Sequence, residues 1–179
     1  MAYETERTLV RDWRPDEADR FFDIYSRWEV ARWLGAEPKT MEDRAEADAR
    51  IARWAALNAG DPVQGRWAVE RKDTGVVVGT VILVRLPDGD GELEVGWHLH
   101  PDSWGHGFAT ESAAGALERT FAGGVEEVFA VVRPDNTASL AVCRRLGMEG
   151  LGRTERYYDT ELELFRLRGE VHDGRPGGR

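Results

Sequence analysis

Apolar residues recur at intervals of three and four positions in the first third of the chain, which is the spacing of an amphipathic helix. The clearest set is Phe21, Ile24, Tyr25 and Trp28. This pattern predicts a helix over residues 15–26, followed by a short helix over residues 29–34. A longer helix over residues 40–57 is predicted to begin at Thr40, which together with Asp43 resembles a capping box.

The middle of the chain changes to alternating and β-branched patterns. Residues 66–71 alternate, residues 75–86 are a β-branched run, and residues 87–91 are dense in turn-forming residues. Beyond the turn, residues 92–100 alternate again, so two sets of side chains lie on opposite faces of one strand. One set is Leu93, Val95, Trp97 and Leu99, and the other is Glu92, Glu94, Gly96, His98 and His100. We predict that these strands form an antiparallel meander.

The remaining elements alternate between helix and strand. We predict a strand over residues 6–13, helices over residues 107–121 and 136–146, and strands over residues 128–132, 151–157 and 161–167. This order favours an α+β or mixed α/β fold around one central sheet. A length of 179 residues fits one domain, placed at residues 1–170, and the Gly- and Pro-rich residues 171–179 are predicted to be disordered.

Composition narrows the class of protein. Lys and Arg total 24 against 33 Asp and Glu, and the resulting net charge of −9 argues against non-specific nucleic-acid binding. The longest uncharged apolar stretch, residues 75–84, is about half of a bilayer span, and the N-terminus lacks the pattern of a secretory signal. The single cysteine, Cys143, cannot form an internal disulfide, which suits a reducing compartment. We therefore expect a cytoplasmic protein that binds neither nucleic acid nor membrane.

The most informative stretch joins the strand that ends at His100 to the helix over residues 107–121. It holds Gly105 and Gly107 in a Gly-x-Gly turn. Such a turn lets the backbone approach a ligand, and the unpaired N–H groups and dipole of a helix start favour an anion, most often phosphate. A tight turn without a ligand is the alternative. The chain lacks the Gly-Lys-[Ser/Thr] of a P-loop, and Thr110 stands where a dinucleotide fingerprint needs Gly or Ala.

Four stretches in order carry a family resemblance: TERTLVRDWRPDEADRFFDIYSRWEVARWLG, ELEVGWHLHPDSWG, WGHGFATES and DNTASLAVCRRLGM. Together they resemble the GNAT superfamily of N-acetyltransferases, and most closely the branch that acetylates the amino termini of ribosomal proteins. WGHGFATES is similar to the family's loop for the pyrophosphate of coenzyme A. Two positions depart from the family pattern: His106 stands where Lys or Arg is common, and Trp104 replaces the Gln or Arg of the wider superfamily.

The resemblance implies a splayed, mostly antiparallel sheet flanked by helices, with acetyl-CoA held where the fourth and fifth strands part. It implies no metal. Carried over by position, the amides from Gly105 through Thr110 hold the pyrophosphate, and the strand near Gly96 and Trp97 pairs with the pantetheine arm. The expected cofactor-binding residues are Gly96, Trp97, Trp104, Gly105, His106, Gly107, Phe108, Ala109, Thr110 and Asn136, although N-capping of a helix would also explain Asn136.

The implied reaction needs a base for the amine, an oxyanion donor and an acid for the departing thiolate. Glu94 matches a position that serves as the base in some relatives. Glu92 and His98 on the same strand face are alternatives, and a merely solvated carboxylate is the competing interpretation. A backbone N–H near Gly96 is the expected oxyanion donor.

Two positions compete for the role of the acid. Tyr157 and Tyr158 match a Tyr-Tyr pair found in many relatives, one of which is the acid there. Ser139 matches the position assigned that role in the ribosomal branch. A tyrosine can instead be an amphipathic wall, and Ser139 can be an ordinary first-turn helix residue.

The resemblance therefore predicts an acetyl-CoA-dependent N-acetyltransferase that moves the acetyl group directly to an amine, with a protein N-terminal α-amine favoured as the acceptor. A small amine, such as an aminoglycoside, a polyamine or an amino-acid-like compound, is the alternative acceptor. A catalytically inactive acetyl-CoA-binding regulatory module is the alternative from another class. A monomer or a homodimer is expected.

Overall fold

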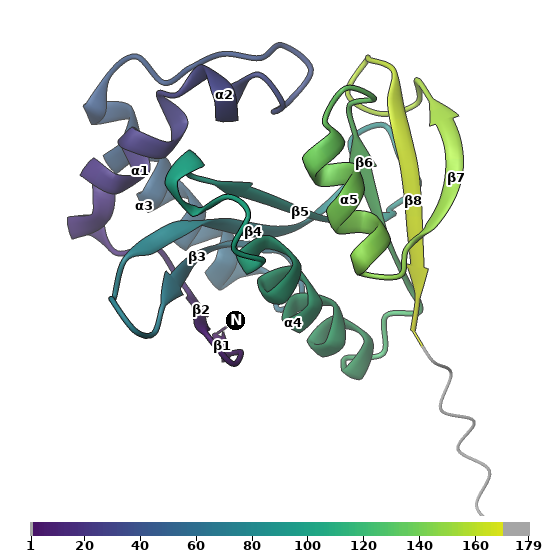
Figure 1. The fold of residues 1–179 in the computed structure, drawn as a ribbon, viewed down its shortest axis with the longest axis horizontal. Coiled ribbons are helices and arrows are strands. Elements are labelled where there is room, and N and C mark those ends of the chain that lie inside the picture. Colours follow the sequence, from purple (N-terminus) through teal and green to yellow (C-terminus); the bar gives the residue numbers. More distant parts are fainter. Residues whose placement is uncertain (1, 170–179) are drawn as a thin grey trace, which may run out of the picture.

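A computed structural model describes residues 2–169, and the tail predicted at residues 171–179 lies outside the described residues. One eight-stranded sheet has the order β1-β2-β3-β4-β5-β6-β8-β7. The bounds are β1 (Tyr3–Glu4), β2 (Thr8–Arg11), β3 (Gly65–Arg71), β4 (Val77–Arg85), β5 (Leu93–Leu99), β6 (Glu127–Val132), β7 (Glu149–Thr154) and β8 (Leu162–Arg168). All neighbouring strands are antiparallel except β5 and β6, which confirms the predicted mixed fold with its mostly antiparallel sheet (Figure 1).

Helices cover both faces of this sheet (Figure 1). They are α1 (Ala18–Tyr25), α2 (Trp28–Ala31), α3 (Arg44–Gly60), α4 (Phe108–Ala122) and α5 (Thr137–Arg145), with 3-10 turns at Pro15–Glu17 and Pro101–Ser103. The prediction that the third helix begins at Thr40 is wrong. Its cap is Asp43, whose Oδ1 accepts a hydrogen bond from the N–H of Ala45 at 2.8 Å. The extended backbone of Asp43 lets this short carboxylate reach the first turn, which a cap at Thr40 would not do.

The predicted meander of β3, β4 and β5 is confirmed, and its two faces pack against different helices. Val81 of β4 pairs with Trp67 of β3 and with Trp97 of β5, on the face that packs against α4. The next row pairs Thr80 with His98 and faces α1 and α3 instead. Alternate residues of β5 therefore belong to different sides of the molecule, as the sequence pattern predicts.

The sheet parts between β5 and β6. These parallel strands are paired at a single position, Glu94 with Phe129. By contrast, β4 with β5 and β6 with β8 are paired along most of their length. Figure 1 shows that β5 stays with the N-terminal strands, whereas β6, β8, β7 and α5 form a separate C-terminal wing. Because so few hydrogen bonds join the two strands, the edge of β5 beyond Glu94 remains open to a ligand.

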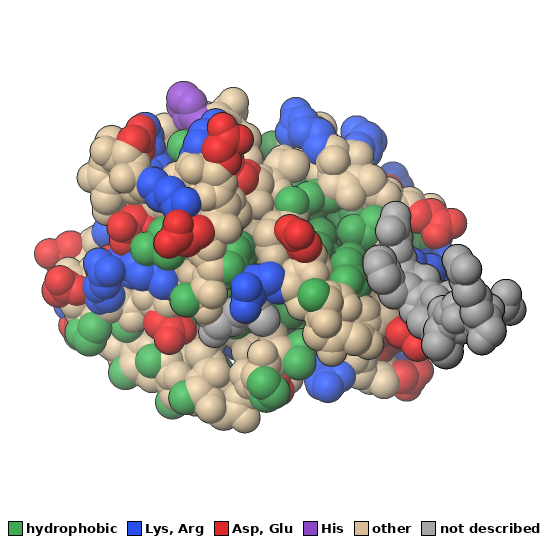
Figure 2. Space-filling view, turned by 90° about the horizontal axis from the view of Figure 1, so that it is seen from below, with side chains coloured by type: hydrophobic (Ala, Val, Ile, Leu, Met, Phe, Trp, Pro, Cys, Tyr) green, Lys and Arg blue, Asp and Glu red, His purple; other side chains and the backbone are tan. Residues whose placement is uncertain are grey.

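The surface carries mixed charge. On the face seen from below, Arg and Lys side chains are interspersed with Asp and Glu (Figure 2). Exposed pairs such as Arg71 with Asp73, at 2.6 Å, contribute little stability each. No helix within residues 2–169 is long and apolar enough to cross a membrane.

Candidate functional site

The Gly-x-Gly turn joins β5 to α4 by way of the 3-10 turn Pro101–Ser103. Gly105 and Gly107 have φ angles of +78° and +82°, a left-handed conformation that costs other residues free energy. Gly107 caps α4 without a side chain, and within residues 2–169 the N–H groups of residues 108–110 have no protein acceptor. The start of α4 thus presents open N–H groups at the positive end of its dipole, an arrangement suited to phosphate.

This turn lines a cavity of about 940 Å³, here called the large cavity. The rest of its wall comes from the turn between β1 and β2, from α2 and the loop after it, from the end of β5, and from the start of α5. Residues 97–99, 103–111 and 135–139 supply most of the lining. Its volume lies within the roughly 300–1,000 Å³ of cofactor and drug-sized ligand sites.

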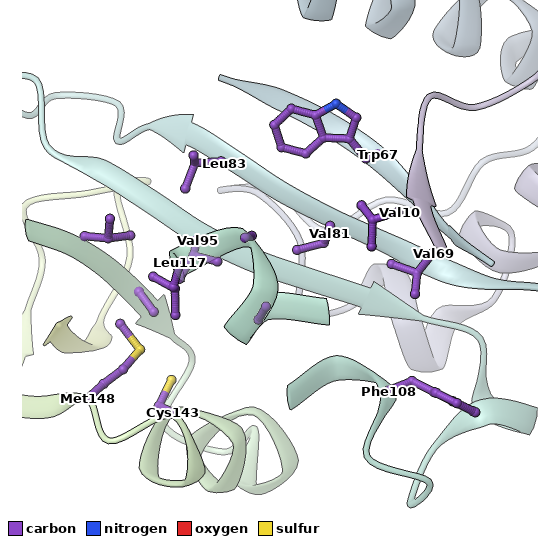
Figure 3. Packing of buried hydrophobic residues seen from close by; sticks show 14 of the residues in the cluster. Val10, Trp67, Val69, Val81, Leu83, Val95, Phe108, Leu117, Cys143 and Met148 are labelled. Carbon is purple, nitrogen blue, oxygen red and sulfur yellow. The ribbon is translucent and has the colours of Figure 1, made fainter. Parts of the chain in front are cut away.

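Trp104 and Phe108 lie on either side of the turn, and their rings point to different environments. The indole of Trp104 stands at the rim, 48% exposed, with its Nε1 donating to the Leu99 carbonyl oxygen at 2.8 Å. The ring of Phe108 turns into the core and is only 5% exposed. Figure 3 shows Phe108 at one end of this cluster, with Cys143 and Met148 at the other. Phe108 can therefore offer a ligand its backbone N–H, whereas Trp104 offers a ring face.

A second cavity of about 170 Å³, the small cavity, lies where β5 and β6 part. Six residues line both cavities, which therefore meet along β5 and α5: Trp33, Leu34, Trp97, His98, Asn136 and Ser139. Every predicted cofactor-binding residue lines one cavity or the other, and Gly96 lines the small one.

Asn136 and Ser139 lie at the junction of the two cavities. The Oδ1 of Asn136 caps α5 by accepting a hydrogen bond from the Ser139 N–H at 3.1 Å. N-capping therefore accounts for one end of the Asn136 side chain, and its amide nitrogen remains available to a ligand. The hydroxyl of Ser139 makes no hydrogen bond within the described part of the chain, so it too can serve a ligand.

Glu94 is the central ionisable residue of the small cavity. It is 7% exposed, so the interpretation that it is a solvated strand carboxylate is wrong. Burial raises the pKa of Glu94 to about 7, although the hydrogen bond from Tyr158 and the charge of Arg66 act in the opposite direction. Its Oε2 accepts a hydrogen bond from the Tyr158 hydroxyl at 2.6 Å. A Cβ built on Gly96 would lie 4.0 Å from its Oε1, so that oxygen lies beside the glycine backbone.

Tyr158 reaches Glu94 from the loop between β7 and β8. Its backbone has a φ of +56°, and the next residue, Asp159, has a φ of +47°. Two adjacent non-glycine residues in the left-handed region cost free energy that the surrounding contacts must offset. Burial and the neighbouring Glu94 raise the pKa of Tyr158, so its hydroxyl stays protonated as a donor. The strained loop thus presents an O–H group to the buried carboxylate.

The structure does not bring Tyr157 or Glu92 to either cavity. Tyr157 packs against Leu86, Phe129 and Leu162, and its hydroxyl donates to the Oε1 of Glu92 at 3.1 Å. Glu92 also pairs with Arg156 at 3.0 Å. Tyr157 and Glu92 therefore have a structural role: their contact holds the β4–β5 turn against the loop before β8.

His98 is held by a hydrogen-bonded chain beneath the junction of the cavities. The Tyr25 hydroxyl donates to the Oγ1 of Thr80 at 2.8 Å and lies 3.1 Å from the Nδ1 of His98. This contact orients the ring with Nδ1 toward Tyr25 and leaves Nε2 outside the chain of hydrogen bonds. Burial lowers the pKa of His98 to about 4, so the ring is a neutral hydrogen-bond acceptor at pH 7 and a weaker base than Glu94.

Sequence patterns alone do not identify three residues of this region. Tyr25 fits the apolar stripe of α1, and its hydroxyl carries no signal of a polar role. Arg133 donates to the carbonyl oxygens of Gly35 at 2.9 Å and Ala36 at 3.3 Å, which ties the loop after α2 to the C-terminal wing. Arg7 lines the large cavity from the far end of the sequence. Each contact joins segments that only the folded chain brings together.

Comparison with known proteins agrees with this geometry. Residues 7–149 match the family described as acetyltransferase (GNAT) domain. Over 168 residues, the chain is 31% identical to the uncharacterized N-acetyltransferase YoaA of Bacillus subtilis, which covers 89% of this chain and 93% of that protein.

The solved structures that share the fold include the following two. Mycobacterium smegmatis RimJ in complex with CoA-disulfide has a TM-score of 0.77 at 20% identity, covering 96% of this chain and 88% of that one. The ribosomal-protein-S5-alanine acetyltransferase of Vibrio fischeri has a TM-score of 0.76 at 18% identity, covering 96% and 98%. Because residues 7–149 match the family and a curated N-acetyltransferase is 31% identical, the chain belongs to the GNAT family and is an acetyl-CoA-dependent N-acetyltransferase.

Proposed function

We propose that the enzyme acetylates the α-amine of a protein or peptide N-terminus, with the amine in the small cavity and acetyl-CoA in the large one. The carboxylate of Glu94 carries this proposal. Among residues 2–169 it is the one acidic side chain that lines the small cavity. Its pKa of about 7 is close to the value near 8 of an α-amine, which suits a general base working at neutral pH.

The large cavity supplies the groups that acetyl-CoA needs. The backbone N–H groups of residues 105–110 would hold the pyrophosphate. The pantetheine arm would pair with the open edge of β5 at Trp97, which lines both cavities, and at Gly96, where the small cavity begins. Asn136 would bond the same arm through its free amide nitrogen, and Trp104 would cover the mouth of the cavity. The RimJ structure of similar fold is a complex with CoA-disulfide, which supports a CoA thioester as the donor.

The reaction assigns separate roles to the residues around Glu94. The amine nitrogen bonds to the thioester carbon, the carbon–sulfur bond breaks, and the proton lost by the amine passes to Glu94. A backbone N–H near Gly96 stabilises the oxyanion. The hydroxyl of Tyr158, or that of Ser139 at the junction, protonates the thiolate. The existing 2.6 Å hydrogen bond favours Tyr158, because Glu94 can return a proton to it directly.

The size and charge of the small cavity favour an α-amine over a polycationic acceptor. A volume of about 170 Å³ accommodates an amine with a small side chain and falls below the roughly 300 Å³ at which drug-sized ligand sites begin. A polyamine or aminoglycoside carries several ammonium groups, each of which needs an anionic partner. The cavity offers Glu94 as its one carboxylate and also contains Arg133, which would repel a second cation.

A thiol-release assay tests the acceptor class. With saturating acetyl-CoA, we expect release of free CoA with short peptides that begin with a small residue and a free α-amine. The matched control is the same peptide with its N-terminus blocked and an internal lysine added, which we expect to be inactive. Spermidine and an aminoglycoside complete the panel. Turnover of those small amines without turnover of any peptide would replace this proposal with the small-amine alternative.

A further inference from the structure

Arg7, in the turn between β1 and β2, contacts the Gly-x-Gly loop from about a hundred residues away in the sequence. Its backbone N–H donates to the Oε1 of Glu111 at 2.7 Å, and its Nε donates to the Oε2 of the same residue at 2.7 Å. Its Nη1 donates to the carbonyl oxygen of His106 at 3.0 Å. One arginine thus holds both the loop before α4 and the first turn of α4.

These contacts fix the part of the loop that contains the open N–H groups. The peptide between His106 and Gly107 is planar, so holding the His106 oxygen fixes the plane that carries the Gly107 N–H. Glu111 is held from a second side, because its Oε1 also accepts a hydrogen bond from Thr5 at 2.5 Å. A Cβ on Gly107 would lie 3.3 Å from the Nη2 of Arg7, which shows how closely the guanidinium approaches the loop.

Arg7 also has hydrogen-bonding capacity left for a ligand. A guanidinium has five N–H donors, and its contacts within residues 2–169 use the Nε, one hydrogen of Nη1 and one of Nη2. The side chain is 49% exposed and lines the large cavity. The remaining N–H groups can therefore reach an anion there, in the forked geometry that suits phosphate oxygens.

The loop itself, residues 104–107, contains neither Lys nor Arg. We propose that Arg7 is the pyrophosphate-anchoring residue of this enzyme: it fixes the loop through His106 and Glu111 and supplies a guanidinium that the loop itself lacks. This inference rests on the proposed placement of acetyl-CoA in the large cavity.

Two donors that differ in the pyrophosphate test the role of Arg7. Acetyl-CoA has this group and the 3′-phosphoadenosine attached to it, and acetyl-pantetheine lacks both. For Arg7→Met, we expect the KM for acetyl-CoA to rise by about 10- to 100-fold, which is the loss expected for hydrogen bonds to a charged group. We expect kcat to change by less than about twofold, and kcat/KM for acetyl-pantetheine to remain within about twofold of wild type.

Arg71→Met is the matched control. The guanidinium of Arg71 lies 5.4 Å from the centre of the Phe108 ring, and that of Arg7 lies 5.1 Å from it. Arg71 pairs with Asp73 and does not line the cavity. We expect its loss to leave the KM for acetyl-CoA within about twofold of wild type. Should Arg7→Met fail to fold, Arg7→Lys replaces it: this variant keeps the charge but loses the fork, so we expect a smaller rise in the same KM.

Two results would overturn the inference about Arg7. One is an equal fall in kcat/KM for both donors, which would make the role of Arg7 purely structural. The other is an unchanged KM for acetyl-CoA in both Arg7 variants. A different result would overturn the placement of acetyl-CoA itself, namely a wild-type enzyme that uses the two donors with equal kcat/KM. The two failures are thus distinguishable.

Discussion

The two cavities that meet at β5 are built in different ways. The large cavity depends on backbone geometry: two glycines with positive φ and a helix start with open N–H groups. The small cavity depends on side chains, above all Glu94 of β5 and Tyr158 of the loop before β8. Apart from the proposed anchor Arg7, a site built from backbone tolerates changes of side chain, whereas a site built from side chains changes its chemistry with each substitution. The donor site should therefore be the more general part of this enzyme and the acceptor site the more specific part.

The largest expected effect comes from removing the base. Glu94→Gln keeps the shape and the hydrogen bond from Tyr158 but cannot accept a proton at neutral pH. We expect kcat to fall by about 10²–10⁴-fold at pH 7. The Kd for CoA, measured by calorimetry, should stay within about twofold of wild type, because the large cavity is unchanged. A parallel loss of CoA binding would contradict the separation of the two cavities.

The next effect concerns the acid. For Tyr158→Phe we expect kcat to fall by about 10- to 100-fold. The hydrogen bond from Tyr158 lowers the pKa of Glu94, so its loss raises that pKa and moves the acidic limb of the pH–rate profile to higher pH. Tyr157→Phe is the matched control. Its hydroxyl contacts Glu92 outside both cavities, so this variant should keep kcat and lose only stability. Equal kcat in the two variants would shift the role of the acid to Ser139.

A smaller effect, on the KM for acetyl-CoA, tests the backbone-built site. Gly105→Ala forces a side chain into a φ of +78° with open space around it, at a cost of about 1–2 kcal/mol. We expect the KM for acetyl-CoA to rise about tenfold through the displaced N–H groups. Gly75→Ala has a φ of +71° and equally open surroundings in the β3–β4 turn. It should lose similar stability and keep its KM, so a similar rise in both variants would contradict the role of the loop.

The last expected effect is on stability rather than on activity, and it is a gain. Burial raises the pKa of Glu94 from 4.5 in the unfolded chain to about 7, so the folded protein binds more protons between these two values. The free energy of unfolding therefore falls as pH rises from about 4.5 through about 7. Glu94→Gln has no carboxyl group to ionise at this position, so its free energy of unfolding does not fall in this way. The pKa shift of Glu94 corresponds to roughly 3 kcal/mol at pH 8. We therefore expect the Tm of Glu94→Gln to exceed that of wild type by about 6–12 °C at pH 8 and by little at pH 5, in thermal melts at both values.

The same contrast explains how much the sequence could predict. The Gly-x-Gly turn, the meander and the alternating faces of β5 are local patterns, and the structure confirms them. The cap of α3 is Asp43 and not the predicted Thr40. Both residue types can cap a helix, and they lie three positions apart, so only the backbone angles decide between them. The dual role of β5 could also be foreseen, because the alternation separates Glu94 from Val95.

The contacts that complete the site could not be predicted in this way. The roles of Tyr157 and Tyr158 were indistinguishable in sequence, and a left-handed loop sends one hydroxyl to Glu92 and the other to Glu94. Burial of Glu94 depends on how β6 and the C-terminal wing close over β5. Arg7 meets His106 only because the β1–β2 turn folds against the start of α4. These pairings join distant segments, so no local pattern reports them.

The most direct measurement is the pH dependence of kcat at saturating acetyl-CoA and peptide, for wild type and for Glu94→Gln. If the buried carboxylate is the base, wild-type kcat rises through a midpoint near pH 7, and the residual activity of Glu94→Gln lacks that step. The same step in both enzymes, or a wild-type midpoint near the ordinary carboxylate value of 4.5, would show that Glu94 does not take the proton.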